Sequence, residues 1–359
     1  MTPRDRFNAW MHFQPVDHPP LWEWGPWGET HKAWLEQGMG PEGPTQFADC
    51  DPRADCGVSF HMEPWFEVQV IEEDDQYILY RNHEGILMRE RKPAELSMPH
   101  FLDYPVKNRA DFERLIAERY DPNDPRRYPA DWDARVAAWK AGDAPLALSG
   151  DRVLSFFGHA RGLMGPEAAM IAMHDDPAFI HDMMEFLADF FIAVARKALT
   201  EAPVDFVVMW EDMCYKTASL ISPAMFREFM VPRYQKVTEF IRSHGVDVIM
   251  VDSDGQVGEL IPLWLQGGVN CVYPMEVQSG MDVVALRKQY GHELLMHGGI
   301  DKRILTQDKA AIDRELEYRL SAMGDGGYIP SFDHSLPPDC RWDLFQYYWE
   351  RKKRLYGMG

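Results

Sequence analysis

The chain has 359 residues, of which 46% are hydrophobic and 26% charged, as is typical of a folded globular protein with a sizeable core. Its 57 acidic residues outnumber its 37 basic ones, and the net charge of -20 disfavours a nucleic-acid partner. The sequence has no apolar run long enough to span a membrane and no signal-peptide pattern near its start, so we expect no membrane contact and a cytoplasmic location. The five cysteines are scattered without a close pair, so no thiolate metal site is expected.

Short apolar runs recur along the chain, separated by amphipathic segments. Each run is apolar on both faces, as parallel strands covered by helices are. Strand, helix and strand in this order are typical of right-handed βαβ units. The predicted strands lie at 20–25, 145–150, 204–210, 246–252, 268–275, 293–299 and 327–332. With one more strand at 58–62, the sequence predicts a (β/α)8 TIM barrel.

Residues 66–91 have a different pattern. Here VQVIEED, QYILYRN and GILMRERK alternate with turn residues, which predicts an antiparallel β meander inserted before most of the barrel. We expect this excursion to cover part of the barrel mouth. No linker divides the chain, so residues 1–359 are predicted to form one domain. A doubly wound sheet would need a glycine-rich phosphate loop after its first strand, and PLWEWGPWGE does not supply one.

Polar and aromatic residues collect where predicted strands end, and in α/β barrels the catalytic groups occupy these positions. We expect three of them to be catalytic, namely Glu211, His297 and His334. The residues expected to contact substrate are Trp22, Glu23, Trp24, Trp27, Asp151, Arg152 and Arg303. Clustered carboxylates at one barrel mouth are costly unless protons or cations compensate them, and this favours a functional site.

Each candidate also has a structural interpretation that the sequence leaves open. Asp151 next to Arg152 could form an internal ion pair, and Glu211 could cap the following helix. Asp254 before Gly255 is a common turn, and His297 could be a hydrogen-bonded structural residue. The tryptophans could belong to the core.

A divalent metal ion is one way to compensate the carboxylates. Asp252, Asp254, Glu211 and His334 offer oxygen and nitrogen ligands, which suit zinc, the expected ion, or manganese or magnesium. The basic residues Arg152, Lys302 and Arg303 are the alternative source of compensating charge.

The C-terminal part of the sequence resembles the uroporphyrinogen decarboxylase superfamily over roughly residues 200–359. The resemblance rests on VDVIMVDSDGQVGEL, then HGGIDKRIL, then GGYIPSFDHSLPPD. TPRDRFNAW, YPVKNRADFERL, GDR and GLMGPE agree with it in the earlier half. True uroporphyrinogen decarboxylases carry an arginine-rich motif where this chain has LWEWGPWGE. The acids of this stretch, Glu23 and Glu29, would repel an anionic tetrapyrrole.

The resemblance therefore implies the corrinoid-dependent methyltransferase branch of the superfamily. Its thiol-acting members hold zinc through His-x-Cys and a later Cys, and the matching positions here are Asp252, Asp254 and His334. We expect a methyltransferase that moves a methyl group from a small methoxylated substrate to a corrinoid carrier protein, as an O-demethylase with metal assistance. The alternatives are a decarboxylase or other lyase acting on a smaller carboxylate, and a tetrapyrrole-binding module without chemistry. The family also implies a homodimer.

Overall fold

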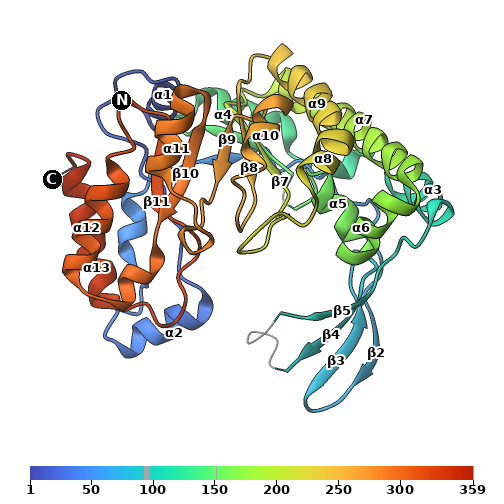
Figure 1. The fold of residues 1–359 in the computed structure, drawn as a ribbon, viewed down its shortest axis with the longest axis horizontal. Helices are drawn as coiled ribbons and strands as arrows, with labels where there is room; N and C mark the ends of the chain where they lie inside the picture. The colour runs from blue at the N-terminus through green and yellow to red at the C-terminus, as the bar shows by residue number, and fades with distance from the viewer. Residues whose placement is uncertain (93–97, 151, 359) are drawn as a thin grey trace.

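A parallel β-sheet forms the centre of the protein (Figure 1), whose computed structural model describes residues 1–92, 98–150 and 152–358. Strands that are neighbours in the chain are also neighbours in the sheet, with helical crossovers between most of them, as in a TIM barrel. The strands are, in sheet order, β1 (Ala54–Asp55), β6 (Leu146–Ser149), β7 (Phe206–Trp210), β8 (Val248–Asp252), β9 (Cys271–Tyr273), β10 (Leu295–Ile300) and β11 (Tyr328–Phe332). Six of the predicted strands are thereby confirmed.

Helices cover the outer face of this sheet. They are α1 (Pro3–Met11), α2 (Gly28–Glu36), α3 (Arg109–Arg119), α4 (Trp132–Ala141), α5 (Phe157–Met164), α6 (Pro166–Asp175), α7 (Pro177–Glu201), α8 (Pro223–Met225), α9 (Val231–Ser243), α10 (Ile261–Gly267), α11 (Val283–Tyr290), α12 (Lys309–Leu320) and α13 (Trp342–Leu355). Shorter helical turns are η1 (Thr45–Asp49), η3 (Pro125–Arg127), η4 (Phe226–Met230), η5 (Val277–Ser279), η6 (Gly291–Glu293) and η7 (Lys302–Thr306). No helix in the described part of the chain combines the length and apolarity that a membrane crossing needs.

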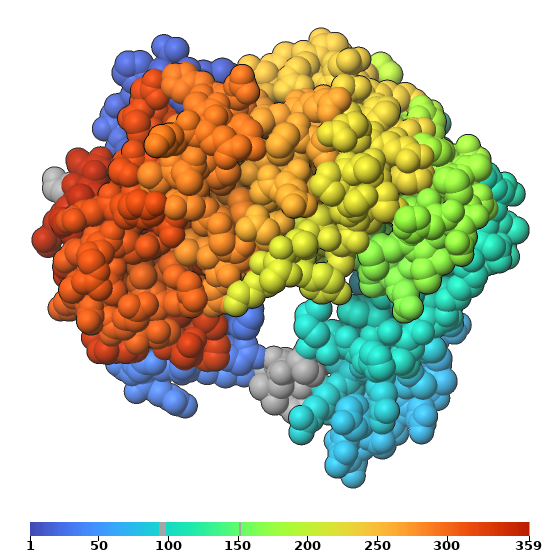
Figure 2. Space-filling model, in the orientation of Figure 1, coloured from blue at the N-terminus to red at the C-terminus, as the bar shows by residue number. Residues whose placement is uncertain are grey.

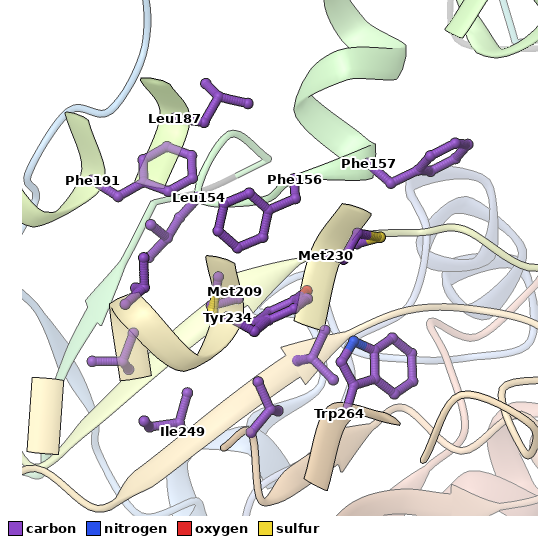
Figure 3. Close-up of a cluster of buried hydrophobic side chains, with 14 of the residues drawn as sticks. Leu154, Phe156, Phe157, Leu187, Phe191, Met209, Met230, Tyr234, Ile249 and Trp264 are labelled. Atoms are coloured by element: carbon purple, nitrogen blue, oxygen red, sulfur yellow. The ribbon is translucent and has the colours of Figure 1, made fainter. Parts of the chain in front are cut away.

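The largest hydrophobic core lies between the sheet and the helices that follow β6 and β7. Figure 3 shows Phe156, Phe191, Tyr234 and Trp264 in one buried cluster with Ile249 of β8. The Phe156 and Tyr234 rings meet edge to face with centroids 5.0 Å apart. This packing fixes the start of α5 against the ends of β7 and β8, where polar residues collect.

The prediction of a strand at 20–25 is wrong, and the barrel is not fully closed by backbone ladders. Directly after the segment, Pro26 forms an isolated parallel bridge with Leu336, which lies beyond the end of β11. Prolines in this stretch cannot donate to a ladder. The Glu23 carboxylate instead accepts a 2.6 Å hydrogen bond from the backbone N–H of Phe332. A side chain therefore takes the place of a backbone partner.

The prediction of a strand at 58–62 is also wrong. β1 ends at Asp55, and Gly57 follows with φ of +65°, which turns the chain out of the sheet. The buried guanidinium of Arg127 donates to the carbonyls of Ser59 and His61, so a side chain satisfies backbone that a strand would pair.

The predicted antiparallel meander is confirmed, with one more strand than expected. It forms a separate sheet of β2 (Gln69–Glu73), β3 (Tyr77–Arg81), β4 (Leu87–Arg91) and β5 (His100–Asp103), which we call the arm. Figure 1 shows the arm extending away from the barrel on the side of α5 and α6.

Candidate functional site

A pocket of about 870 Å³ lies at the carboxyl ends of the parallel strands. The barrel contributes Ser149, Trp210, Asp252 and Tyr273 from β6 to β9, and the arm side contributes Phe101 among others. Figure 2 shows the hollow between the arm and the barrel body. Carboxyl ends of barrel strands are where this fold builds active sites, so the location matches the expectation.

Asp252 stands at the centre of this pocket wall. It is the last residue of β8, and the strand register puts it level with Trp210 of β7 and Tyr273 of β9. Burial raises the pKa of Asp252 to about 8, and the nearby carboxylates of Asp254 and Asp212 push in the same direction. A hydrogen bond from Tyr273 opposes the shift. Asp252 is therefore protonated at neutral pH.

His334 and Asp254 form an ion pair beside Asp252, with Nε2 and Oδ2 3.6 Å apart. The interaction with Asp254 raises the pKa of His334 against the opposing effect of burial. The imidazole ring lies parallel to Trp24 at a centroid distance of 5.5 Å and edge to face with Trp27 at 6.4 Å. The structure thus brings five of the predicted site residues to one pocket, namely Asp252, Asp254, His334, Trp24 and Trp27.

A glycine is required at position 255, directly after Asp254. Gly255 has φ of +87°, and a Cβ atom there would lie 2.6 Å from the carbonyl oxygens of Cys214 and Tyr215. Any side chain would therefore push the Asp254 loop away from the loop that follows β7.

Two arginines also line the pocket. Arg161 donates to the Asp212 carbonyl at 2.7 Å and pairs with its carboxylate at 3.0 Å, while its guanidinium lies 5.0 Å from the Trp210 ring centroid. Arg152 lies in the turn after β6 and also lines the pocket, as predicted. Asp151, predicted to contact substrate, lies outside the described residues.

A buried tyrosine–histidine pair contacts the turn that carries Arg152. His159 hydrogen-bonds through Nδ1 to the Val153 carbonyl and through Nε2 to the Tyr120 hydroxyl, each at 2.8 Å. The Nδ1–H therefore donates and Nε2 accepts. Burial lowers the pKa of His159 to about 4, which keeps the ring neutral.

The structure does not bring Glu211 into the pocket. Its side chain is fully buried and accepts hydrogen bonds from the backbone of Phe156 and Gly158, at 2.9 and 2.8 Å, and from the Tyr234 hydroxyl at 2.5 Å. Burial raises its pKa to about 6. Glu211 thus caps the start of α5, a helix that precedes it in the chain, and not the following helix that the structural alternative named, and this contact leaves the metal and catalytic roles without support.

Glu23 and Trp22 also lie outside the pocket lining. Glu23 is buried against Lys352 of α13 at 2.8 Å and accepts a hydrogen bond from the Tyr348 hydroxyl at 2.6 Å. Trp22 is buried inside the barrel and stacks on Phe7 at 5.1 Å. Both residues fasten the N-terminal segment to the barrel, so a direct contact with substrate is not supported.

His297 and Arg303 are likewise displaced from the pocket. His297 is buried inside the barrel against Trp22 and Tyr273, and burial lowers its pKa to about 3, so its ring is uncharged at neutral pH. Arg303 forms a two-pronged ion pair with Asp301. The predicted catalytic role of His297 and substrate contact of Arg303 are therefore not supported.

The donor set does not fit a resident metal ion. With Glu211 turned away, Asp252, Asp254 and His334 remain, and within residues 1–92, 98–150 and 152–358 no three His, Cys, Asp or Glu side chains are grouped to hold one. The predicted zinc site therefore has no geometric support.

Several pocket residues were missed by the sequence interpretation, among them Tyr273, Trp210, Arg161 and the Tyr120–His159 pair. For Tyr273 and Trp210 the sequence did hold a signal, namely the alternation of side chains along each strand. Residues at one level of neighbouring strands share a face, so Asp252 implies Trp210 and Tyr273. No sequence pattern indicates that α5 and the segment before η3 reach the same pocket.

Comparisons with known proteins identify the family. A family model described as uroporphyrinogen decarboxylase (URO-D) matches residues 94–354. A uroporphyrinogen decarboxylase from Nocardia farcinica is 26% identical over 179 residues, covering 48% of each chain, and one from Nostoc sp. is 24% identical over 181 residues, covering 50% of this chain and 49% of the relative. The chain thus spans about half the length of the curated relatives it matches.

The fold extends the similarity to the whole chain. A methyltransferase from Methanosarcina mazei has a TM-score of 0.63 and 14% identity, and the match covers 99% of both chains. At this identity the likeness concerns the fold. Together with the strand order and the pocket at the carboxyl ends, the matching model shows that the chain belongs to the uroporphyrinogen decarboxylase family of enzymes.

Proposed function

We propose that the chain transfers a methyl group from a small methoxylated substrate to a corrinoid carrier protein, with Asp252 as the proton donor. One observation carries the proposal: Asp252 lines the pocket and has a pKa of about 8. An ether oxygen leaves poorly unless it receives a proton as its bond to the methyl carbon breaks. A pocket carboxyl group that is neutral at pH 7 supplies that proton.

The neighbouring groups support this role. Burial is the main cause of the raised pKa of Asp252, and repulsion from Asp254 and Asp212 adds to it, whereas the electrostatic interaction with His334 lowers this pKa and so favours the carboxylate that remains after proton transfer. Trp24 and Trp27 offer apolar surface to the substrate. A reduced corrinoid, when its carrier protein presents it, supplies the nucleophile that accepts the methyl group.

The pocket suits a substrate with few negative charges. Asp212 and Asp254 line it as carboxylates, and Asp212 already engages Arg161. A porphyrinogen carrying many carboxylates would meet these acids with little compensation. The substrate of the curated relatives therefore fits this chain poorly.

A second candidate is decarboxylation of a smaller carboxylate. It is favoured by the name of the curated relatives and by Arg152, which lines the pocket and could bind a carboxylate. In that reaction carbon dioxide leaves, and the Asp252 proton goes to carbon instead of oxygen.

The test compares two variants at opposite ends of one strand. The wild type, Asp252→Asn and Asp247→Asn are incubated with a panel of methyl ethers and free cob(I)alamin, and demethylated product and methylcobalamin are measured. Asp247 lies before β8 and pairs with His12 on the far side of the barrel, so it is the matched control. We expect turnover in the wild type and the control. In Asp252→Asn the rate of product formation should fall by about 100-fold or more.

The opposite outcome is equally clear. Release of carbon dioxide from small carboxylates without any corrinoid, and no methyl transfer from any ether, would replace the proposal with the decarboxylase.

A further inference from the structure

The outer strand of the arm presents an apolar edge. β2 stands at one end of the arm sheet and, within the described part of the chain, pairs with β3 alone. Figure 1 shows β2 on the opposite side of the arm from β5, the strand that contributes to the pocket lining. Every residue from 67 to 76 is exposed, and we call this run the arm edge. Three of its apolar side chains are more than half exposed, namely Val68 at 59%, Val70 at 56% and Ile71 at 57%.

Apolar side chains on a free sheet edge need an explanation, because the open backbone groups of such an edge pair readily with another strand. Edge strands are usually protected by lysine, proline or a bulge. β2 reads QVIEE and has neither lysine nor proline, but it has a bulge that leaves Ile71 outside the ladder with β3. Val68 and Val70 precede the bulge and are accessible to an added strand. Neighbouring exposed apolar side chains mark an interaction site, whereas scattered ones do not.

The charge of the arm edge indicates which kind of partner fits it. It contains no basic residue and five acidic ones, namely Glu67, Glu72, Glu73, Asp74 and Asp75. Lys92, which follows β4, pairs with Glu73. Glu67 precedes the three apolar residues and the other acids follow them, so negative charge lies on both sides of an apolar centre. An apolar segment with basic residues at both ends is complementary to this pattern.

A second copy of this chain fits the arm edge poorly. If two copies of β2 paired antiparallel with the centre of symmetry at Val70, at Ile71 or between them, Glu67 of each copy would lie opposite an acid of the other, namely Glu73, Asp74 or Asp75. Like charges directly opposite each other destabilise a strand pair. The net charge of -20 on each chain adds further repulsion. The same charge attracts a cationic partner.

We propose that the arm edge is a docking site for an extended segment of a partner protein, with apolar residues in its centre and lysine or arginine at its ends. The segment adds a strand to the arm sheet and packs its apolar side chains against Val68, Val70 and Ile71. Its basic ends lie close to Glu67 on one side and to the acids after Ile71 on the other. The residues of the arm edge all lie outside the pocket lining, so the inference is independent of the proposed function.

The test uses a synthetic peptide with alternating valine and threonine in its centre and two lysines at each end. A second peptide has glutamates in place of the lysines. Fluorescence anisotropy gives the Kd of each peptide, and amide hydrogen exchange shows which backbone segment becomes protected. The variant Val70→Lys changes the centre of the arm edge. Ile171→Lys makes the same kind of change at an isoleucine of α6 that is 51% exposed, and it is the matched control. Thermal melting shows that both variants retain the fold.

We expect the lysine peptide to bind the wild type and Ile171→Lys about 10-fold or more tightly than the glutamate peptide. Binding should protect backbone amides within the arm edge. In Val70→Lys the Kd of the lysine peptide should rise about 10-fold or more, because the apolar contact is lost and a like charge faces the peptide. Because any cationic peptide is attracted to a chain of net charge -20, the difference between the two variants and the place of protection decide the test.

Four results would each overturn the proposal: equal affinities for the two peptides, an equal loss of binding in Ile171→Lys and Val70→Lys, protection elsewhere than at the arm edge, and binding of neither peptide. Sedimentation of the protein without peptide tests the remaining occupant. A dimer that Val70→Lys dissociates and Ile171→Lys does not would assign the arm edge to a second copy of this chain instead.

Discussion

At the scale of single residues, the protonation of Asp252 makes a prediction about pH. In the wild type, kcat should fall as the pH rises through about 8, because the deprotonated carboxylate cannot donate. Asp252→Asn should lower kcat about 100- to 10,000-fold near neutral pH and should lack this falling limb. Asp254→Asn should move the limb to lower pH, since the Asp254 charge helps to raise the pKa of Asp252. A pH–rate profile of the three proteins checks this, and an unchanged limb in Asp252→Asn would assign it to another group.

The same residue links pH to stability. The pKa of Asp252 is higher in the folded chain, about 8, than its ordinary value of 3.8, so its contribution to the free energy of unfolding is fully present below about pH 4. That contribution is lost as the pH rises from there through 8. Asp252→Asn has no such loss, so we expect it to gain stability relative to the wild type over this range. Urea unfolding at several pH values measures the gain, and parallel curves would contradict it.

Glu211 gives a second prediction at this scale, and it concerns folding. Replacing it with alanine leaves the N–H groups of Phe156 and Gly158 and the Tyr234 hydroxyl without their acceptor. Each buried unsatisfied group costs about 1–3 kcal/mol, so Glu211→Ala should lower the free energy of unfolding by about 3 kcal/mol or more. Glu259→Ala, at an exposed acid, is the control and should change it by less than about 0.5 kcal/mol. If both variants changed the free energy of unfolding by the same amount, the capping role of Glu211 would be contradicted.

At the scale of elements, the attachment of the N-terminal segment depends on one buried ion pair. Glu23 joins this segment to β11 and α13 through Phe332 and Lys352. Glu23→Gln leaves the Lys352 ammonium buried without its counter-charge and should cost about 3–5 kcal/mol. The double variant Glu23→Gln/Lys352→Met should recover part of this loss, because both buried charges are then gone. Chemical unfolding of the three proteins measures it, and a double variant no more stable than Glu23→Gln would contradict the explanation.

The same elements show what could be predicted from sequence. Strands such as β7 and β8 were predictable because both faces are buried, which leaves continuous apolar runs. The segments 20–25 and 58–62 have similar runs, yet the side chains of Glu23 and Arg127 take the hydrogen bonds that strands would use. Such long-range contacts leave no local pattern. For Glu211 the pattern was present: it follows Trp210, which faces the pocket, so alternation already turns Glu211 away.

At the scale of the whole molecule, the barrel and the arm share one pocket, and the arm should contribute to binding. Phe101 of β5 lines the pocket, whereas Val70 of β2 lies on the outer strand of the arm, exposed and outside the lining. Phe101→Ala removes an aromatic contact of about 0.5–1.5 kcal/mol, so the substrate Kd should rise about 2- to 10-fold. Val70→Ala should leave it unchanged. Titration of the ligand that the wild type binds checks both variants.

The two variants also show whether the arm takes part in substrate binding or whether the barrel binds the substrate alone. A weaker Kd in Phe101→Ala alone means that the inner strand of the arm forms part of the substrate site, so the inserted meander extends the barrel mouth. Unchanged binding in both variants would confine recognition to the barrel, where Arg152, Asp252 and the tryptophans lie. The exposed apolar side chains at the outer edge of the arm, Val68, Val70 and Ile71, would then require a different explanation, because none of them lines the pocket.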